Sequence, residues 1–252
     1  MTGRRPSAGQ RQADPGGPSA HAYTGSRSGA AWWDLYADPP RWAAEYPDAA
    51  VLTDWIADHL MQPHPDLGRD GPVCPFIRQT ANRHCLWVAV LRGGDELTVE
   101  QISAATLDAH ELYTRLRASD SDNRWLTAVT VFPGLTRCDR IDSVHHRHKT
   151  QVVRDGSMLG QFYPGCEVPG LWNAAFPALD APLPMLVVRP MMSTDYPFLA
   201  ARAEWLYAYF STVAPHLPRG LRWSIAQWMR VPEADAGAIT ALRVHARDEH
   251  AT

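Results

Sequence analysis

Two histidines on one predicted helix are the residues whose types and spacing first suggest chemistry. With an advance of about 100° per residue, His145 and His148 lie on the same side as Ile141, Val144 and Val152. This apolar stripe is expected to face the core. An imidazole there serves either as a structural core residue or as a metal ligand, heme ligand or acid–base group. His148, about 20° from Ile141, is the first choice as a metal or cofactor ligand, and His145 is the second.

A cysteine between prolines is the next candidate. The sequence Gly71-Pro72-Val73-Cys74-Pro75-Phe76 leaves little backbone freedom around Cys74. A thiol fixed in this way is either a thiolate ligand or nucleophile, or a small buried side chain in a rigid turn. We predict that Cys74 is catalytic.

Three arginines are predicted to bind carboxylates. Arg189 is placed at the end of an expected strand and is predicted to be catalytic, while Arg154 and Arg78 are predicted to contact a cofactor. A guanidinium binds a carboxylate through two parallel hydrogen bonds, which suits heme propionates or an amino acid. The alternative for each is a solvated surface charge. Asp195 is expected to cap a helix rather than to act as an acid.

Hydrophobic patterning predicts the elements that position these residues. Apolar runs predict strands, helical spacing predicts helices, and Thr98 with Gln101 forms a capping box. The expected strands are residues 85–91, 125–132, 157–163 and 185–188. The expected helices are 48–60, 99–116, one that starts at 139 and ends before the strand at 157, and 198–213, with a short helical turn at 31–36. This order favours an α+β fold, a ferredoxin-like sandwich with additional N- and C-terminal helices.

The chain is predicted to hold one domain. Residues 1–29 are rich in Gly, Pro, Ser, Gln and Arg, so we expect them to be disordered. Residues 30–252 are expected to form a single α+β domain whose core spans about 63–213. The aperiodic stretch 164–184 is expected to be an ordered loop over a pocket, because it contains Trp172 and Phe176.

Composition limits the functional class. The 252 residues carry 24 Lys and Arg against 27 Asp and Glu, a net charge of −3, which argues against a nucleic-acid partner. No apolar run is long enough to cross a membrane, and no signal peptide is visible. The four cysteines include no Cys-x-x-Cys pair. We therefore expect a cytoplasmic protein with free thiols that acts on a small molecule, and a homodimer is allowed.

Three motifs resemble a bacterial family of unknown function. They are Gly71-x-x-Cys74-Pro75-Phe76, Gly156-x-Met158-x-Gly160-Gln161-Phe162 and Pro184-x-Leu186-x-x-Arg189-x-Met191-x-x-x-Asp195-x-x-Phe198-Leu199. A weaker resemblance, carried by Cys74-Pro75-Phe76, the element order and Arg189, is to the YqcI/YcgG family, some of whose members are heme-dependent enzymes of specialised metabolism. That resemblance implies heme and oxidation of an amino-acid or amine nitrogen. The family's aromatic-rich second helix is not matched.

Three functional hypotheses follow. The first is a heme-dependent oxygenase that acts on an amino-acid or amine nitrogen. The second is a non-heme metal enzyme in which His145, His148, Cys74 and His84 converge. The third is a non-catalytic small-molecule binder or partner protein.

Overall fold

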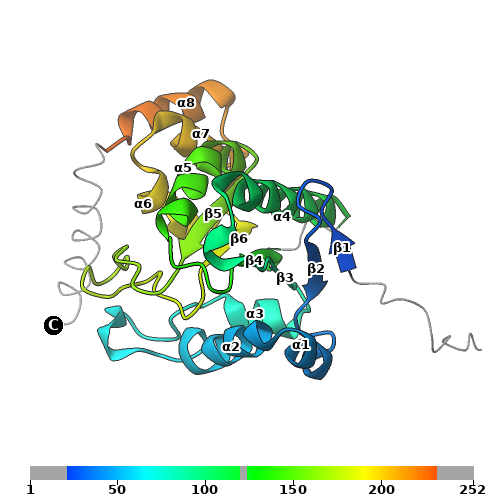
Figure 1. Cartoon of the computed structure of the whole chain (residues 1–252). Helices are drawn as coiled ribbons and strands as arrows, with labels where there is room; N and C mark the ends of the chain where they lie inside the picture. Colours follow the sequence, from blue (N-terminus) through cyan, green and yellow to red (C-terminus); the bar gives the residue numbers. More distant parts are fainter. Residues whose placement is uncertain (1–21, 120–123, 232–252) are drawn as a thin grey trace, which may run out of the picture.

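A six-stranded mixed sheet forms the centre of the molecule (Figure 1). The computed structural model describes residues 22–119 and 124–231. Strand order is β1-β2-β3-β4-β6-β5. β3 and β4 are parallel, and every other neighbouring pair is antiparallel. The predicted α+β class is confirmed.

The elements have the following bounds. The strands are β1 Ala22–Thr24, β2 Ala31–Asp34, β3 Leu86–Val90, β4 Thr127–Val131, β5 Ser157–Phe162 and β6 Met185–Pro190. The α-helices are α1 Pro39–Glu45, α2 Pro47–Trp55, α3 Ile77–Asn82, α4 Val99–Ser119, α5 Asp139–Arg154, α6 Tyr196–Leu199, α7 Ala203–Val213 and α8 Arg219–Trp228. A π-helical turn, Ile56–Leu60, extends α2, and short 3-10 turns cover Pro65–Leu67, Gly94–Glu96 and Ser193–Asp195.

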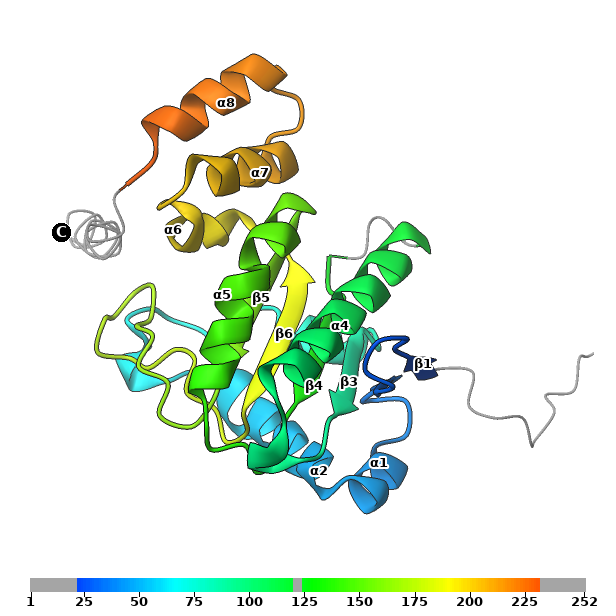
Figure 2. The same ribbon diagram turned by 45° about the horizontal axis from the view of Figure 1, so that its top comes forward.

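Helices cover both faces of the sheet (Figure 2). α4 and α5 pack on one face, where Ile102, Leu112 and Ile141 meet Leu186 and Val188 of β6. The N-terminal helices pack on the other face around β3 and β4. A third cluster joins α7 and α8 to α5 beyond the end of the sheet.

Local signals explain why the main helices and strands form where they do. The Thr98 amide donates to Gln101 Oε1 at 2.8 Å and the Gln101 amide to Thr98 Oγ1 at 3.2 Å, so the predicted capping box starts α4. The apolar stripe of α5 is buried through Ile141, Val144 and Val152. Each of the four predicted strands is present, shorter than predicted by one to three residues or, in β6, longer by two.

The predictions for residues 31–36 and for the ferredoxin-like arrangement differ from the structure. Residues 31–36 were predicted as a helical turn, but Ala31–Asp34 is strand β2, because it pairs with β3 through Trp33 and Val88. A split βαβ unit of the ferredoxin-like kind places another strand between its two parallel strands. Here β3 and β4 pair directly, so the ferredoxin-like arrangement is not present.

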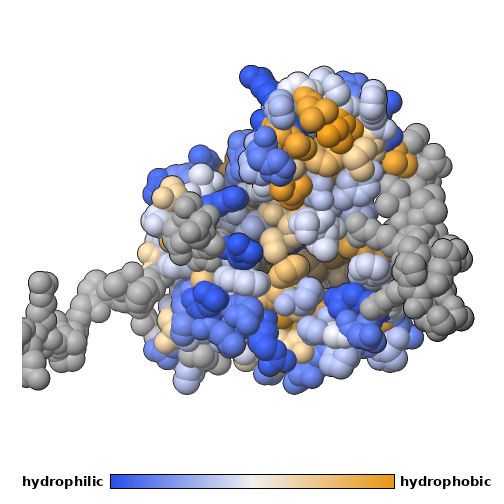
Figure 3. Space-filling view, turned by 180° about the vertical axis from the view of Figure 1, so that it is seen from behind, coloured by the Kyte–Doolittle hydropathy of each residue, from blue (hydrophilic) through white to orange (hydrophobic). Residues whose placement is uncertain are grey.

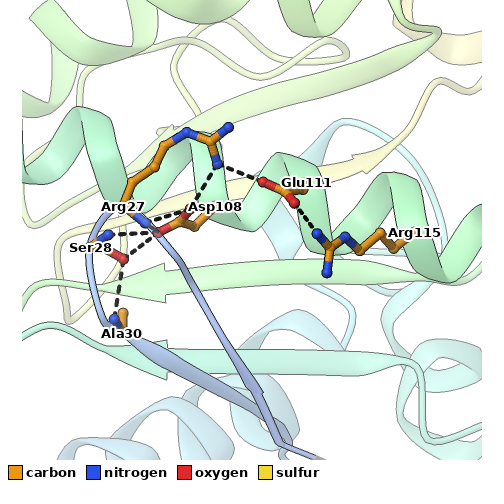
Figure 4. Close-up of polar contacts among 6 residues, drawn as sticks. All are labelled: Arg27, Ser28, Ala30, Asp108, Glu111 and Arg115. Carbon is orange, nitrogen blue, oxygen red and sulfur yellow. Dashed lines mark hydrogen bonds and ion pairs between the residues drawn. The ribbon is translucent and has the colours of Figure 1, made fainter.

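A buried carboxylate holds the N-terminal turn to α4 (Figure 4). Asp108 accepts hydrogen bonds from the amides of Arg27 and Ser28, from the Ser28 hydroxyl at 2.7 Å and from the Arg27 guanidinium at 2.9 Å. Gly25 lies so close that an added Cβ would stand 2.3 Å from the carboxylate. Disorder was predicted for residues 1–29. For residues 22–29 this is wrong, because Asp108 supplies the partners that their polar backbone needs; residues 1–21 lie outside the described residues.

The helix α8 exposes several apolar side chains. Trp228 is 87 % exposed, and Leu221, Trp223 and Met229 are exposed as well. Figure 3 shows this patch at the top of the molecule and an apolar hollow below it. None of the helices in the described part of the chain has the length and apolar character to cross a bilayer.

Candidate functional site

A pocket of 530 Å³ lies between two loop segments that are distant in sequence. One wall comes from residues 55–66, the end of α2 and the turns after it. The other wall comes from residues 164–182, part of the loop that joins β5 to β6. The lining residues are Trp55, His59, His64, Asp66, Pro164, Ala175, Phe176, Pro177, Asp180, Ala181 and Pro182. The predicted ordered loop over a pocket is therefore confirmed.

Aromatic rings and imidazoles alternate along this pocket. Trp55 stacks on His59 with ring centroids 6.0 Å apart, and His59 stacks on Phe176 at 6.4 Å. His64 lies 5.9 Å from His59 and 5.1 Å from Phe176. Phe176 is buried, whereas Trp55, His59 and His64 are half-buried. Two imidazoles and two aromatic rings thus line one cavity.

The two histidines differ in their surroundings. His64 Nδ1 accepts a hydrogen bond from the Asp66 amide at 3.1 Å, so the neutral ring carries its proton on Nε2. Burial lowers the pKa of His59, the nearby His64 lowers it further, and the charge of Asp180 opposes both effects. At neutral pH His59 is therefore an uncharged imidazole that can accept a proton.

Two contacts join the walls of the pocket. The Asn173 side-chain amide donates to the Asp66 carbonyl at 2.8 Å. Gly68 has φ of 76°, and a Cβ there would stand 2.6 Å from the Trp172 carbonyl oxygen. Only glycine allows both this conformation and this close approach. The predicted loop residue Trp172 thus contributes its backbone to the closure rather than its ring to the lining.

Cys74 and Arg189, the two residues predicted to be catalytic, interact electrostatically, but the guanidinium of Arg189 bonds to other groups. Arg189 makes a two-fold ion pair with Asp195 at 2.8 and 2.7 Å, and Asp195 also accepts from the Met192 amide. Burial alone would lower the pKa of Arg189. Its bonds to Asp195, with a smaller contribution from Cys74, outweigh burial, so the pKa is raised. Asp195 therefore holds the turn after β6, as the predicted capping role implies.

Cys74 and Arg189 lie on the face of the sheet that is nearer the pocket. On this face Gly160, Phe162 and Val187 are half-buried. Phe162 contacts Trp55 edge to face at 6.4 Å, and Trp55 lines the pocket. The half-buried face of β5 and β6 thus adjoins the pocket through these two rings.

The predicted ligands His148 and His145 lie elsewhere, between α5 and its neighbours. The Ser103 hydroxyl of α4 hydrogen-bonds with His148 Nε2. His145 Nε2–H donates to the Leu159 carbonyl at 3.0 Å. Burial lowers the pKa of both rings, that of His145 to about 4. Nε2 of each ring already has a protein partner, which matches the structural alternative left open for these residues.

The remaining predicted residues are not brought to these histidines. Arg154 pairs with Glu204 at 2.8 Å, and Arg78 donates to the Met61 carbonyl at 3.1 Å. His84 pairs with Asp34 at 3.0 Å. Within the described residues, no group of three or more His, Cys, Asp or Glu is arranged to hold a metal ion. A heme does not fit the predicted set, because Ser103 occupies His148 Nε2 and carboxylates of the chain occupy Arg189 and Arg154.

Sequence reasoning missed the groups that face the pocket. Neither His59 nor His64 was singled out from the sequence. Asp66 and Asp180 were not singled out. The available signal was the pair of histidines five residues apart across a helix end, next to a proline.

Comparison with known proteins gives the family but no chemistry. No curated protein and no solved structure matches the chain. A family model described as "Domain of unknown function (DUF6875)" matches residues 49–224, which include both walls of the pocket, Cys74 and Arg189. Because this match covers more than half of the 252 residues, the chain belongs to that family.

Proposed function

We propose that this protein is an enzyme that acts on a small molecule held in the pocket between His59 and His64. The observation that carries the proposal is the pair of imidazoles facing one 530 Å³ cavity. Cavities of this size suit small-molecule ligands, and a site with few polar groups on an apolar lining is typical of them.

His59 and His64 have complementary roles in this proposal. His59, whose pKa is lowered by burial, accepts a proton from the bound substrate. His64, with Nδ1 bonded to the Asp66 amide, offers Nε2–H to an oxygen or nitrogen on which negative charge develops. The hydrogen bond from the Asn173 side chain to the Asp66 carbonyl holds the two walls of the pocket together.

Fragment screening by amide NMR tests the binding half of the proposal. Fragments that bind are expected to shift the amide signals of Gly165 and Ala175, which are on or beside the pocket wall. Bound fragments are then incubated with the wild type and assayed by mass spectrometry for conversion. No shift of these signals by any fragment would refute the pocket as a binding site.

Histidine variants test the catalytic half. His59→Gln is expected to reduce turnover by about 100-fold or more, as loss of a general base does, with binding nearly unchanged. His146→Gln, a change at an exposed histidine on α5, is the matched control. Unchanged turnover in His59→Gln would remove His59 from the mechanism. Binding without turnover in the wild type would favour the non-catalytic binder instead.

Heme-dependent oxidation of an amino-acid or amine nitrogen stays a prediction from the YqcI/YcgG resemblance. The electrostatic interaction of Cys74 with Arg189 supports a role for that pair, although Asp195 occupies the guanidinium. An absorption spectrum of protein expressed with heme precursor and iron tests it. A Soret band that Cys74→Ala removes and His148→Ala retains would place a heme at the Cys-Pro-Phe turn.

A further inference from the structure

The charges around the pocket are all of one sign. Asp66 and Asp180 are carboxylates in the lining, and among the residues that the structure describes no lysine or arginine lines it. The Asp66 side chain is 72 % exposed, while Asp180 accepts a hydrogen bond from the Gly165 amide at 2.8 Å. With His59 neutral, the fixed charge that a ligand meets is negative.

The nearby arginine does not offset these carboxylates. Arg69, in the same loop as Asp66, directs its guanidinium to the backbone carbonyls of Asp70, Pro72 and Val73 at 2.9 to 3.0 Å. A guanidinium held by three carbonyls is not aimed at a ligand carboxylate. The pocket therefore lacks the group that recognition of an acid would need.

The walls of the pocket also suit a cation. Trp55 and Phe176 line the pocket, and Trp is the strongest aromatic partner for an ammonium group. The prolines at 164, 177 and 182 add apolar surface without adding donors. An ammonium group beside the carboxylates and an apolar body on the rings would use both the acidic and the aromatic groups of the lining.

We infer that the ligand of this pocket is a small protonated amine with an aromatic or other apolar body, rather than a carboxylate or phosphate. The inference rests on the proposed function, since it assigns the substrate class of the same pocket. Asp66 and Asp180 bind the ammonium group, and Trp55 with Phe176 contacts the body.

Three probes of similar size and different charge test this inference. They are 2-phenylethylamine, the neutral 2-phenylethanol and the anionic 3-phenylpropanoate, each titrated into the isotopically labelled full chain. Amide signals of Gly165 and Ala175 and the indole signal of Trp55 report binding. The amine is expected to bind at least tenfold more tightly than the anion, with an affinity that falls as salt is added.

Carboxylate variants test the assigned contacts. Asp66→Asn and Asp180→Asn are each expected to weaken amine binding about two- to fivefold, as loss of one exposed ion pair does. Asparagine at 180 keeps an oxygen for the Gly165 amide, so the loop geometry is preserved. Glu167→Gln, a change at an exposed acid of the same loop outside the lining, is expected to leave the affinity unchanged. Phenylethanol binding should not change in any of the three variants.

The outcomes separate this inference from the proposed function. If the anion binds as tightly as the amine, or if neither Asp variant weakens the amine, the amine assignment is overturned while the pocket stands. If none of the three probes shifts the pocket signals and the fragment screen is also silent, the pocket itself fails as a site.

Discussion

Acid is expected to destabilise this protein through His145, and the size of the effect follows from the structure. Burial, with the charge of Lys149 as a smaller cause, lowers the pKa of His145 to about 4. In the unfolded chain a histidine has a pKa of about 6.5. Between these values the unfolded chain binds a proton that the folded chain excludes, so stability falls as pH falls from 6.5 toward 4.

The expected loss at pH 5 is about 2 kcal/mol relative to pH 8. It follows from the proton-binding terms, 1 + 10^(pKa − pH), of the unfolded and folded states: the loss is RT times the logarithm of their ratio, with a pKa of 6.5 in the unfolded chain and about 4 in the folded chain. The value is an upper one, because the residue is half-buried and water screens part of the charge. Above pH 7 the two terms are equal and the contribution is fully present.

Urea unfolding at pH 8 and pH 5 measures this loss. His145→Gln keeps a side-chain N–H for the Leu159 carbonyl but does not titrate, so it should lose about 2 kcal/mol less than the wild type between the two pH values. His146→Gln, at an exposed position of the same helix, should behave as the wild type does. Contributions from other histidines cancel in the comparison. Equal losses in wild type and His145→Gln would refute the assignment of a buried neutral ring.

Three further outcomes are expected. Gly68→Ala should lower stability by about 1–3 kcal/mol and weaken ligand binding, because residue 68 has φ of 76° and its Cβ would clash with the Trp172 carbonyl. Gly29→Ala, with φ of 70° and open space around it, should show only the smaller cost of the backbone strain. Thermal melts of the two variants measure the difference. Asp108→Ala should cost about 1–3 kcal/mol by denaturant unfolding, since it leaves part-buried donors of the N-terminal turn unpaired; a change below 0.5 kcal/mol, roughly the scale of a surface substitution, would contradict the anchor. All four cysteines, which are free in the structure, should react with a thiol reagent in denaturant without reductant; recovery of only two would reveal a disulfide.

Local periodicity predicted those elements whose signals lie within one segment. The capping box at Thr98 and the apolar stripe of α5 depend on neighbours three to seven residues apart, so the sequence alone placed both helices. Strand β2 was missed because it pairs with β3, for example Trp33 with Val88, and these residues are far apart in sequence. The N-terminal turn was taken as disordered because Asp108, the carboxylate that satisfies it, belongs to a distant helix.

The same limit applied to the candidate site. Trp172 and Phe176 indicated an ordered loop over a pocket, and Cys74 and Arg189 were both singled out before their proximity was known. The helical stripe drew attention to His145 and His148, since burial alone does not distinguish a ligand from a ring bonded to a neighbouring hydroxyl or carbonyl. His59 shares a cavity with Asp180, a contact that only the folded chain creates.

The hydrogen bond from Asn173 to the Asp66 carbonyl has a thermodynamic consequence. It closes a span of 107 residues, so the pocket between the two walls exists only in the folded chain. A ligand that touches both walls therefore binds the native state alone and not the unfolded chain. At 100 times its dissociation constant it would add about 2.7 kcal/mol to the free energy of unfolding. Occupancy of this pocket can thus be read from the melting temperature of the whole domain before any reaction is known.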